Sequence, residues 1–165
     1  RSDALGFTGN PGITVVSVSR PLAGEHRVLN LGSNSGASGG HVGFSTGEPS
    51  FRFNNGNQVF FDGAADGATW VQTAWVREAG ATYAGVSGGV CYRNGTLLAE
   101  SGSGSPTLTP TLVDQETIIG CGRTTGGVPN TFIGGPLAEV LIFDATLAAS
   151  DITKLWAYHR AKWAL

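Results

Sequence analysis

The sequence has 165 residues, 26 of them glycine, with a formal net charge of −2 at pH 7 and 13% charged residues. So small and slightly negative a net charge gives no electrostatic attraction to a nucleic acid or an anionic membrane, and both are excluded as partners. No apolar run approaches the ~20 residues of a membrane span. A chain of this length forms one domain with its own core, here residues 1–165.

Short apolar segments alternate with Gly, Pro and Asn along most of the chain. They predict strands at 13–19, 27–31, 42–45, 50–54, 58–61, 69–77, 82–93, 96–100, 117–122 and 138–143. About ten short strands separated by turn signals are typical of an all-β sandwich of two antiparallel sheets. The low charge and high glycine content agree with this fold class.

Turn residues and alternation set the details of these strands. Val28 is expected on the opposite face from Leu29 and Leu31, and residues 46–49 are expected to form a loop. Asn55-Gly56 and Asn94-Gly95 predict two-residue hairpin turns, because Asn-Gly accepts positive φ at both central positions. Residues 101–114 and 123–135 are expected to be irregular.

The C-terminal region combines a strand with a helix. Residues 138–143 are apolar on both alternating faces except at Glu139, which predicts a strand deep in a sheet with both faces covered. Beyond Asp144 the period becomes helical, and an amphipathic helix is expected to dock through one stripe. The stripe consists of Ile152, Leu155, Trp156, His159 and Trp163.

These last residues carry a family resemblance. The positions that match are Gly135, 137–144, Leu147, 150–152, Leu155, Ala157, Tyr158 and 161–163. They resemble the C-terminus of the concanavalin A-like lectin/glucanase superfamily, and most closely its laminin-G-like modules of bacterial and viral type. Residues 13–21 and 117–123 resemble two further strands of that family. The resemblance implies a jelly-roll sandwich, and an opening section of the family is missing here, so the domain is expected to be part of a longer protein.

The same resemblance implies two functions. One is a non-catalytic glycan-binding or adhesion module of a secreted or surface protein. The other is a structural decoration or fibre component of a virus particle, with neighbouring protein subunits or further copies of the chain as partners. A missing opening strand would leave an uncovered sheet edge, and this suits the second function if a neighbouring subunit covers the edge. Residues 13–19 should therefore be either internal to their sheet or covered by another chain.

Patterns of enzymatic chemistry are weak in this sequence. The segment 36–40 fits G-x-S-x-G, but it lies in a Gly/Ser tract without the strand and helix of a nucleophile elbow. Glycoside hydrolysis by retention needs two carboxylates about 5–5.5 Å apart, and the E-x-D-x-x-E pattern of the glucanases is not present. The histidines His26, His41 and His159 have no clustered partners in the sequence. The protein is therefore not expected to be an enzyme.

Candidate ligand-binding residues remain in strands and loops. Aromatic rings beside Asp and Asn hold sugars by stacking and hydrogen bonding, although core packing is the simpler interpretation of each ring. The candidates are Arg52, Asn54, Asp62, Asp66, Trp70 and Tyr83. Asp62 and Asp66 also form a loose D-x-x-x-D-G pattern, but calcium needs six or more oxygens and a solvated turn is favoured. No cofactor is predicted.

The two cysteines, Cys91 and Cys121, both lie in predicted strands. They permit one disulfide bridge, but a free cysteine is also a common buried apolar residue. Spacing alone does not show that the two strands are neighbours.

Overall fold

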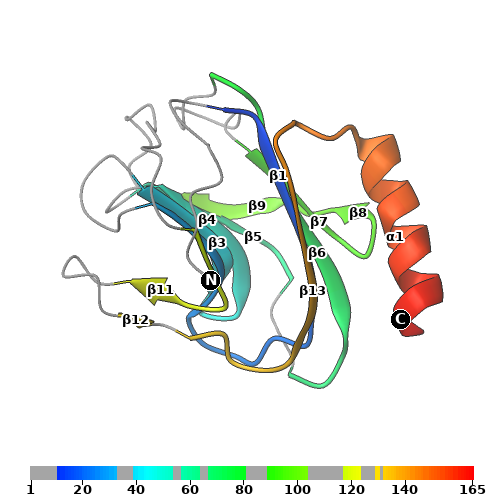
Figure 1. Ribbon diagram of the computed structural model, residues 1–165, viewed down its shortest axis with the longest axis horizontal. Helices are drawn as coiled ribbons and strands as arrows, with labels where there is room; N and C mark the ends of the chain where they lie inside the picture. Colours follow the sequence, from blue (N-terminus) through cyan, green and yellow to red (C-terminus); the bar gives the residue numbers. More distant parts are fainter. Residues whose placement is uncertain are drawn as a thin grey trace.

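Figure 1 shows the computed structural model of the protein, in which two antiparallel sheets pack face to face and one helix lies outside one sheet. The structure describes residues 11–32, 39–53, 57–63, 67–80, 89–103, 117–123, 129–130 and 132–165. The jelly-roll sandwich with a C-terminal helix is therefore confirmed.

The strands follow one another as β1 (Ile13–Ser19), β2 (His26–Gly32), β3 (Gly39–Ser45), β4 (Glu48–Phe53), β5 (Asn57–Phe61), β6 (Val71–Arg77), β7 (Gly89–Arg93), β8 (Thr96–Leu97), β9 (Glu100–Ser103), β10 (Thr117–Ile119), β11 (Gly122–Arg123), β12 (Pro129–Asn130) and β13 (Leu137–Phe143), before α1 (Ala149–Trp163). One sheet has the order β13-β1-β6-β7-β8 and the other the order β10-β2-β3-β4-β5-β9. β11 and β12 form a small separate pair.

β1 lies inside the five-stranded sheet, and all seven of its residues are buried. It pairs with β13 on one side and with β6 on the other. The expectation that this strand is internal or covered by another chain is met by the first alternative. An uncovered edge at β1 therefore gives no support to the virus-particle interpretation.

β13 occupies a different place from the one predicted. Both its faces are covered, since Val140 and Ile142 pack against the core between the sheets and Leu141 and Phe143 against the helix side. Among the described strands, however, β13 is the outermost of its sheet, and each of its residues is only partly buried. The prediction of a deep position was wrong. A strand that is apolar on two faces has both faces covered, but this pattern does not show whether the strand has a neighbouring strand at each edge.

The core between the sheets is built from large side chains of both layers. Trp75 of β6 is fully buried and meets Phe44 of β3 edge-on, with 5.6 Å between ring centroids. Cys91 also lies in this cluster. Cys91 and Cys121 are both buried free thiols, so they do not form a bridge. Burial raises the pKa of the Cys91 thiol well above its usual value.

A bulge in β2 changes which side chains enter the core. The register with β3 shifts between Arg27 and Leu29, and Val28, Leu29 and Leu31 all pack into the same cluster. The prediction that Val28 faces away from the two leucines was therefore wrong. A bulge adds one residue to a strand, so simple alternation fails across it.

Two-residue turns join several strands. Asn94 (φ 52°) and Gly95 (φ 77°) form the predicted turn between β7 and β8. The expected loop at 46–49 is instead a turn of Thr46 (φ 53°) and Gly47 (φ 89°), because Glu48 and Pro49 already pair with β3. Two regions expected to be irregular also contain strands, β9 and β12. Asn55-Gly56 lies outside the described residues.

The helix α1 covers the outer face of the five-stranded sheet (Figure 1). Ile152 is fully buried against Val16, Ala74 and Val76, while Leu155 and Trp156 are partly buried. Trp163 leaves 39% of its surface exposed, so the last residue of the predicted stripe is not docked as a core side chain. No helix in the described residues is long and apolar enough to cross a membrane.

Candidate functional site

A row of polar residues crosses the outer face of the six-stranded sheet. Cross-strand pairing aligns Asn30 of β2 with His41 of β3, His41 with Arg52 of β4, and Arg52 with Gln58 of β5. The core residues Leu29, Val42, Phe51 and Val59 alternate with them and form the neighbouring row on the inner face. We call Asn30, His41, Arg52 and Gln58 the polar row.

A second row runs beside the polar row on the same face. Arg27 pairs with Gly43, Gly43 with Ser50, Ser50 with Phe60, and Phe60 with Gly102. Phe60 is partly buried and lies outside the core cluster, and Gly102 leaves the ring without a side chain beside it on β9. The outer face therefore offers one aromatic ring next to the polar row.

Most of these polar side chains are held tightly. Asn30 is 1% exposed, Ser50 1%, and Arg27 and His41 5% each. Arg27 also contacts Glu25, with 3.5 Å between Nη2 and Oε1. Side chains this buried are not open to a ligand. Among the polar-row side chains that the structure describes, Gln58 is the one that is only partly buried, and Asn30 and His41 can only support its position from below.

The chemistry of this face is that of recognition. An amide presents donors and an acceptor, a guanidinium presents a planar fork of donors, and an aromatic ring presents a flat apolar surface. Together these groups suit a ligand with many hydroxyls and an apolar ring face. Neither row contains a carboxylate, so the pair that glycoside hydrolysis requires is not formed here.

The residues predicted from sequence are spread over the structure. Arg52 lies in the polar row, and Asp62 follows β5 as an exposed residue whose N–H donates to the carbonyl of Ala99. Trp70 is partly buried and directly precedes β6, in the other sheet from Arg52. Asn54, Asp66 and Tyr83 lie outside the described residues. Among those described, no three His, Cys, Asp or Glu side chains gather as a metal site would require.

Sequence reasoning missed Asn30, His41, Gln58 and Phe60. Each is a single polar or aromatic residue within an otherwise ordinary strand. Only strand order and register bring them side by side. Alternation opposite the core residues is the one signal in the sequence that could have placed them on a common face.

A second polar cluster fixes α1 to the five-stranded sheet. The buried His159 accepts a hydrogen bond at Nδ1 from the Gln72 amide (2.8 Å), and its Nε2 faces Glu139 Oε2 at 3.6 Å. Glu139 also accepts hydrogen bonds from Trp163 Nε1 (2.8 Å) and Lys162 Nζ (3.1 Å). The sequence shows no clustered partners for His159, because the partners found here come from β6 and β13, far away in sequence.

This cluster docks the helix and lacks the parts of a catalytic triad. The partners recorded for His159 are an amide and a carboxylate, and no hydroxyl or thiol nucleophile is among the bonds described for it. Burial lowers the pKa of His159, an effect that Glu139 opposes and Lys162 reinforces. Burial acts to raise the pKa of Glu139, but hydrogen bonds from Trp163 and Lys162 outweigh it and the pKa is lowered.

Both shifts predict that acid destabilises the domain. In the unfolded chain His159 takes up a proton below the usual histidine pKa of about 6.5, whereas in the folded protein its lowered pKa keeps it neutral to lower pH. Because the unfolded state then binds more protons, the stability of the folded state falls as the pH drops. Further acidification removes the contribution of Glu139 in the same direction. We expect a lower melting temperature at pH 5.5 than at pH 7.5, and a smaller difference in the His159→Gln variant. An unchanged pH dependence in that variant would contradict the assignment.

Comparison with known proteins identifies relatives of the fold. No protein-family model and no curated protein matches the sequence. Among solved structures, the Ruminococcus gnavus IT-sialidase CBM40 bound to alpha2,3 sialyllactose matches with a TM-score of 0.66 at 12% identity, over 89% of this chain and 83% of that chain. The binding domain of botulinum neurotoxin serotype G matches with a TM-score of 0.61 at 12% identity, over 95% and 39%.

A third structure, the binding domain of botulinum neurotoxin DC in complex with rat synaptotagmin II, matches with a TM-score of 0.56 at 12% identity, over 90% of this chain and 36% of that chain. At these identities the likeness shows a shared fold, the lectin-like jelly roll.

Proposed function

We propose that this chain is a non-catalytic carbohydrate-binding module of the laminin-G-like type that its sequence resembles, acting outside the cell or at its surface. The observation that carries the proposal is the polar row beside Phe60 on the outer face of the six-stranded sheet. A solved module of the same fold, at 12% identity, is bound to sialyllactose, which supports a glycan as the ligand class.

The proposed binding mode combines hydrogen bonds with stacking. Arg52 and Gln58 contact sugar hydroxyls, and the ring of Phe60 lies against an apolar sugar face. The sequence candidate Asn54, two positions after Arg52, is proposed as a further contact to the same sugar. The loop candidates Asp62, Asp66, Trp70 and Tyr83 form a second set, proposed to contact longer glycans.

The experiment is a glycan array followed by calorimetry on the best ligand. Phe60→Ala should weaken binding by about 2- to 10-fold, the size of one aromatic contact of about 0.5–1.5 kcal/mol. Arg52→Ala should weaken it by about 10-fold or more, since hydrogen bonds to charged groups are worth about 1.5–3 kcal/mol. The matched controls are Phe132→Ala and Arg160→Ala, an exposed ring and an exposed cation outside both rows.

Two results would count against this proposal. One is an array without any bound glycan, and the other is binding that survives both Phe60→Ala and Arg52→Ala unchanged. A chain that binds no glycan but forms stable oligomers in solution would instead favour the structural-subunit alternative, with copies of itself or neighbouring subunits as partners.

A further inference from the structure

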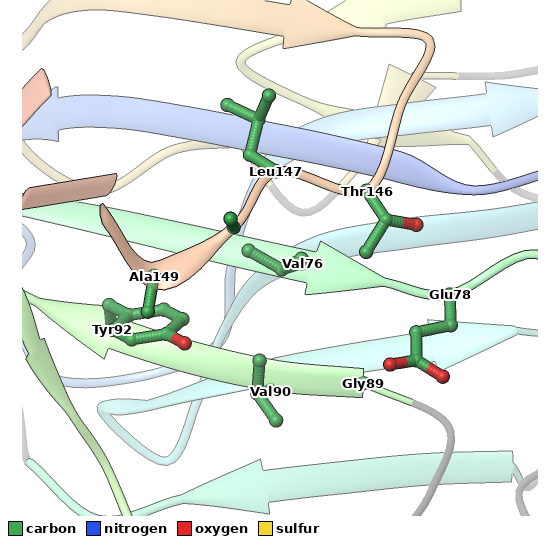
Figure 2. Close-up of a pocket in the computed structure, with 9 residues that line it drawn as sticks. Val76, Glu78, Gly89, Val90, Tyr92, Thr146, Leu147 and Ala149 are labelled. Atoms are coloured by element: carbon green, nitrogen blue, oxygen red, sulfur yellow. The ribbon is translucent and has the colours of Figure 1, made fainter. Parts of the chain in front are cut away.

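A pocket of about 560 Å³ lies on the side of the molecule away from the polar row. It is bounded by β6, β7 and the segment that leads from β13 into α1, as Figure 2 shows. Volumes between about 300 and 1,000 Å³ are typical of small-molecule sites.

The floor and walls of the pocket are mainly apolar. Val76 and Val90 lie along the floor, Leu147 and Ala149 come from the entry to the helix, and the ring of Tyr92 closes one end (Figure 2). The pocket remains open because α1 packs over β13, β1 and β6 and leaves Val90 of β7 37% exposed. An apolar body of small size fits such a surface.

One carboxylate gives the pocket its charge. Glu78 is exposed and lies across the pocket from Tyr92, near Thr146 (Figure 2). Among the described residues, no lysine, arginine or histidine lines the pocket, and Glu78 forms no ion pair with any of them. The Thr146 hydroxyl donates to the carbonyl of Arg77 (2.8 Å), so its oxygen can still accept a hydrogen bond.

The amino end of α1 also borders the pocket, and a helix amino end carries about half a positive charge. That charge would favour an anion. Asp151 in the first turn pairs with Lys154, with 2.9 Å between Nζ and Oδ1, so these two charges largely cancel. The full negative charge of Glu78 exceeds the half charge of the helix end, and the pocket therefore favours a cation.

We propose that this pocket binds a small apolar molecule that carries one ammonium or guanidinium group. The apolar body lies on Val76, Val90 and Tyr92, and the cationic group pairs with Glu78 and donates to the Thr146 hydroxyl. This site is separate from the proposed glycan face and does not depend on it, because the two lie on different sheets.

Three probes of similar shape and different charge test the proposal on the whole chain by NMR titration: 2-phenylethylamine, 2-phenylethanol and 3-phenylpropanoate. We expect the amine to bind most tightly and to shift the amide signals of Val90, Tyr92 and Leu147. The alcohol should bind more weakly at the same place, and the carboxylate should bind least.

Substitutions test whether Glu78 supplies the negative charge that binds the amine. Glu78→Gln should weaken amine binding by about two- to fivefold, the size of an exposed ion pair, and bring it close to that of the alcohol. Glu100→Gln, which removes an exposed carboxylate on β9 of the other sheet, should leave it unchanged. Val90→Arg should abolish it by placing a cation in the pocket, and its melting temperature reports whether the fold is kept.

The proposal is overturned if the anionic probe binds as well as the amine, or if Glu78→Gln binds the amine with undiminished affinity. Shifts confined to amides outside the pocket would overturn it as well.

Discussion

A chain that lacks residues 149–165 should aggregate on expression. The deletion removes α1 and exposes the apolar outer face of the five-stranded sheet, which includes Val16, Ala74, Val76, Leu141 and Phe143. It also leaves the buried Gln72 without His159. Exposed apolar patches of this kind are aggregation surfaces. Size-exclusion chromatography with light scattering measures the outcome, and a soluble, cooperatively melting monomer would show that the helix is dispensable.

Single substitutions separate loss of packing from loss of the whole helix. Ile152→Ala empties the fully buried centre of the interface and should cost about 2–5 kcal/mol of unfolding free energy. Thr153→Ala changes the next residue, which is exposed, and should cost within about 0.5 kcal/mol. Urea denaturation of both variants provides the comparison. Equal losses of unfolding free energy in the two variants would mean that Ile152 is not at the centre of the contact between α1 and the sheet.

Gly43→Val should yield no folded protein. A Cβ atom at this position of β3 would clash with the carbonyl oxygen of His26 and lie 2.9 Å from the Cα of Arg27. Both neighbours are backbone atoms next to the bulge in β2, so they cannot move aside without breaking the pairing of β2 with β3. The expected loss of unfolding free energy is about 4–5 kcal/mol or more, a size that few single substitutions reach.

Gly102→Ala is the matched control for Gly43→Val. Gly102 is also a strand glycine of the six-stranded sheet, but among the described residues an added Cβ would meet only the Phe60 ring, at an ordinary 3.9 Å. Soluble yield and far-UV circular dichroism should therefore match those of the unaltered protein. A folded Gly43→Val variant would mean that β2 and β3 are farther apart than the structure shows.

The sequence predicted the elements whose pattern is local. β1 has the bounds that were expected, because its ends are marked by Gly12 and Arg20-Pro21. The Asn94-Gly95 turn also follows from residue type alone. Features that depend on the pairing of strands were not predicted. The bulge that turns Val28 inward and the edge position of β13 are consequences of register and strand order.

The candidate site was predictable only in part for the same reason. Arg52 was selected because it alternates with Phe51 and Phe53, but its row neighbours His41 and Gln58 come from other strands. His41 was set aside because no residues that could form a triad or a metal site with it cluster nearby in the sequence. A histidine in a strand acquires its neighbours from the adjacent strands, and a single sequence does not reveal which strands are adjacent.

The pairing of β1 with β13 has a consequence for how the protein folds. The hydroxyl of Thr14, in β1, donates to the carbonyl of Ala145, directly after β13, across 131 positions of chain. Contacts between such distant residues carry a large loop-closure entropy and slow folding to milliseconds or seconds. During synthesis β1 can pair with β6 early, but its other edge stays open until β13 has left the ribosome. A chaperone that shields this edge would therefore be most useful before the helix emerges.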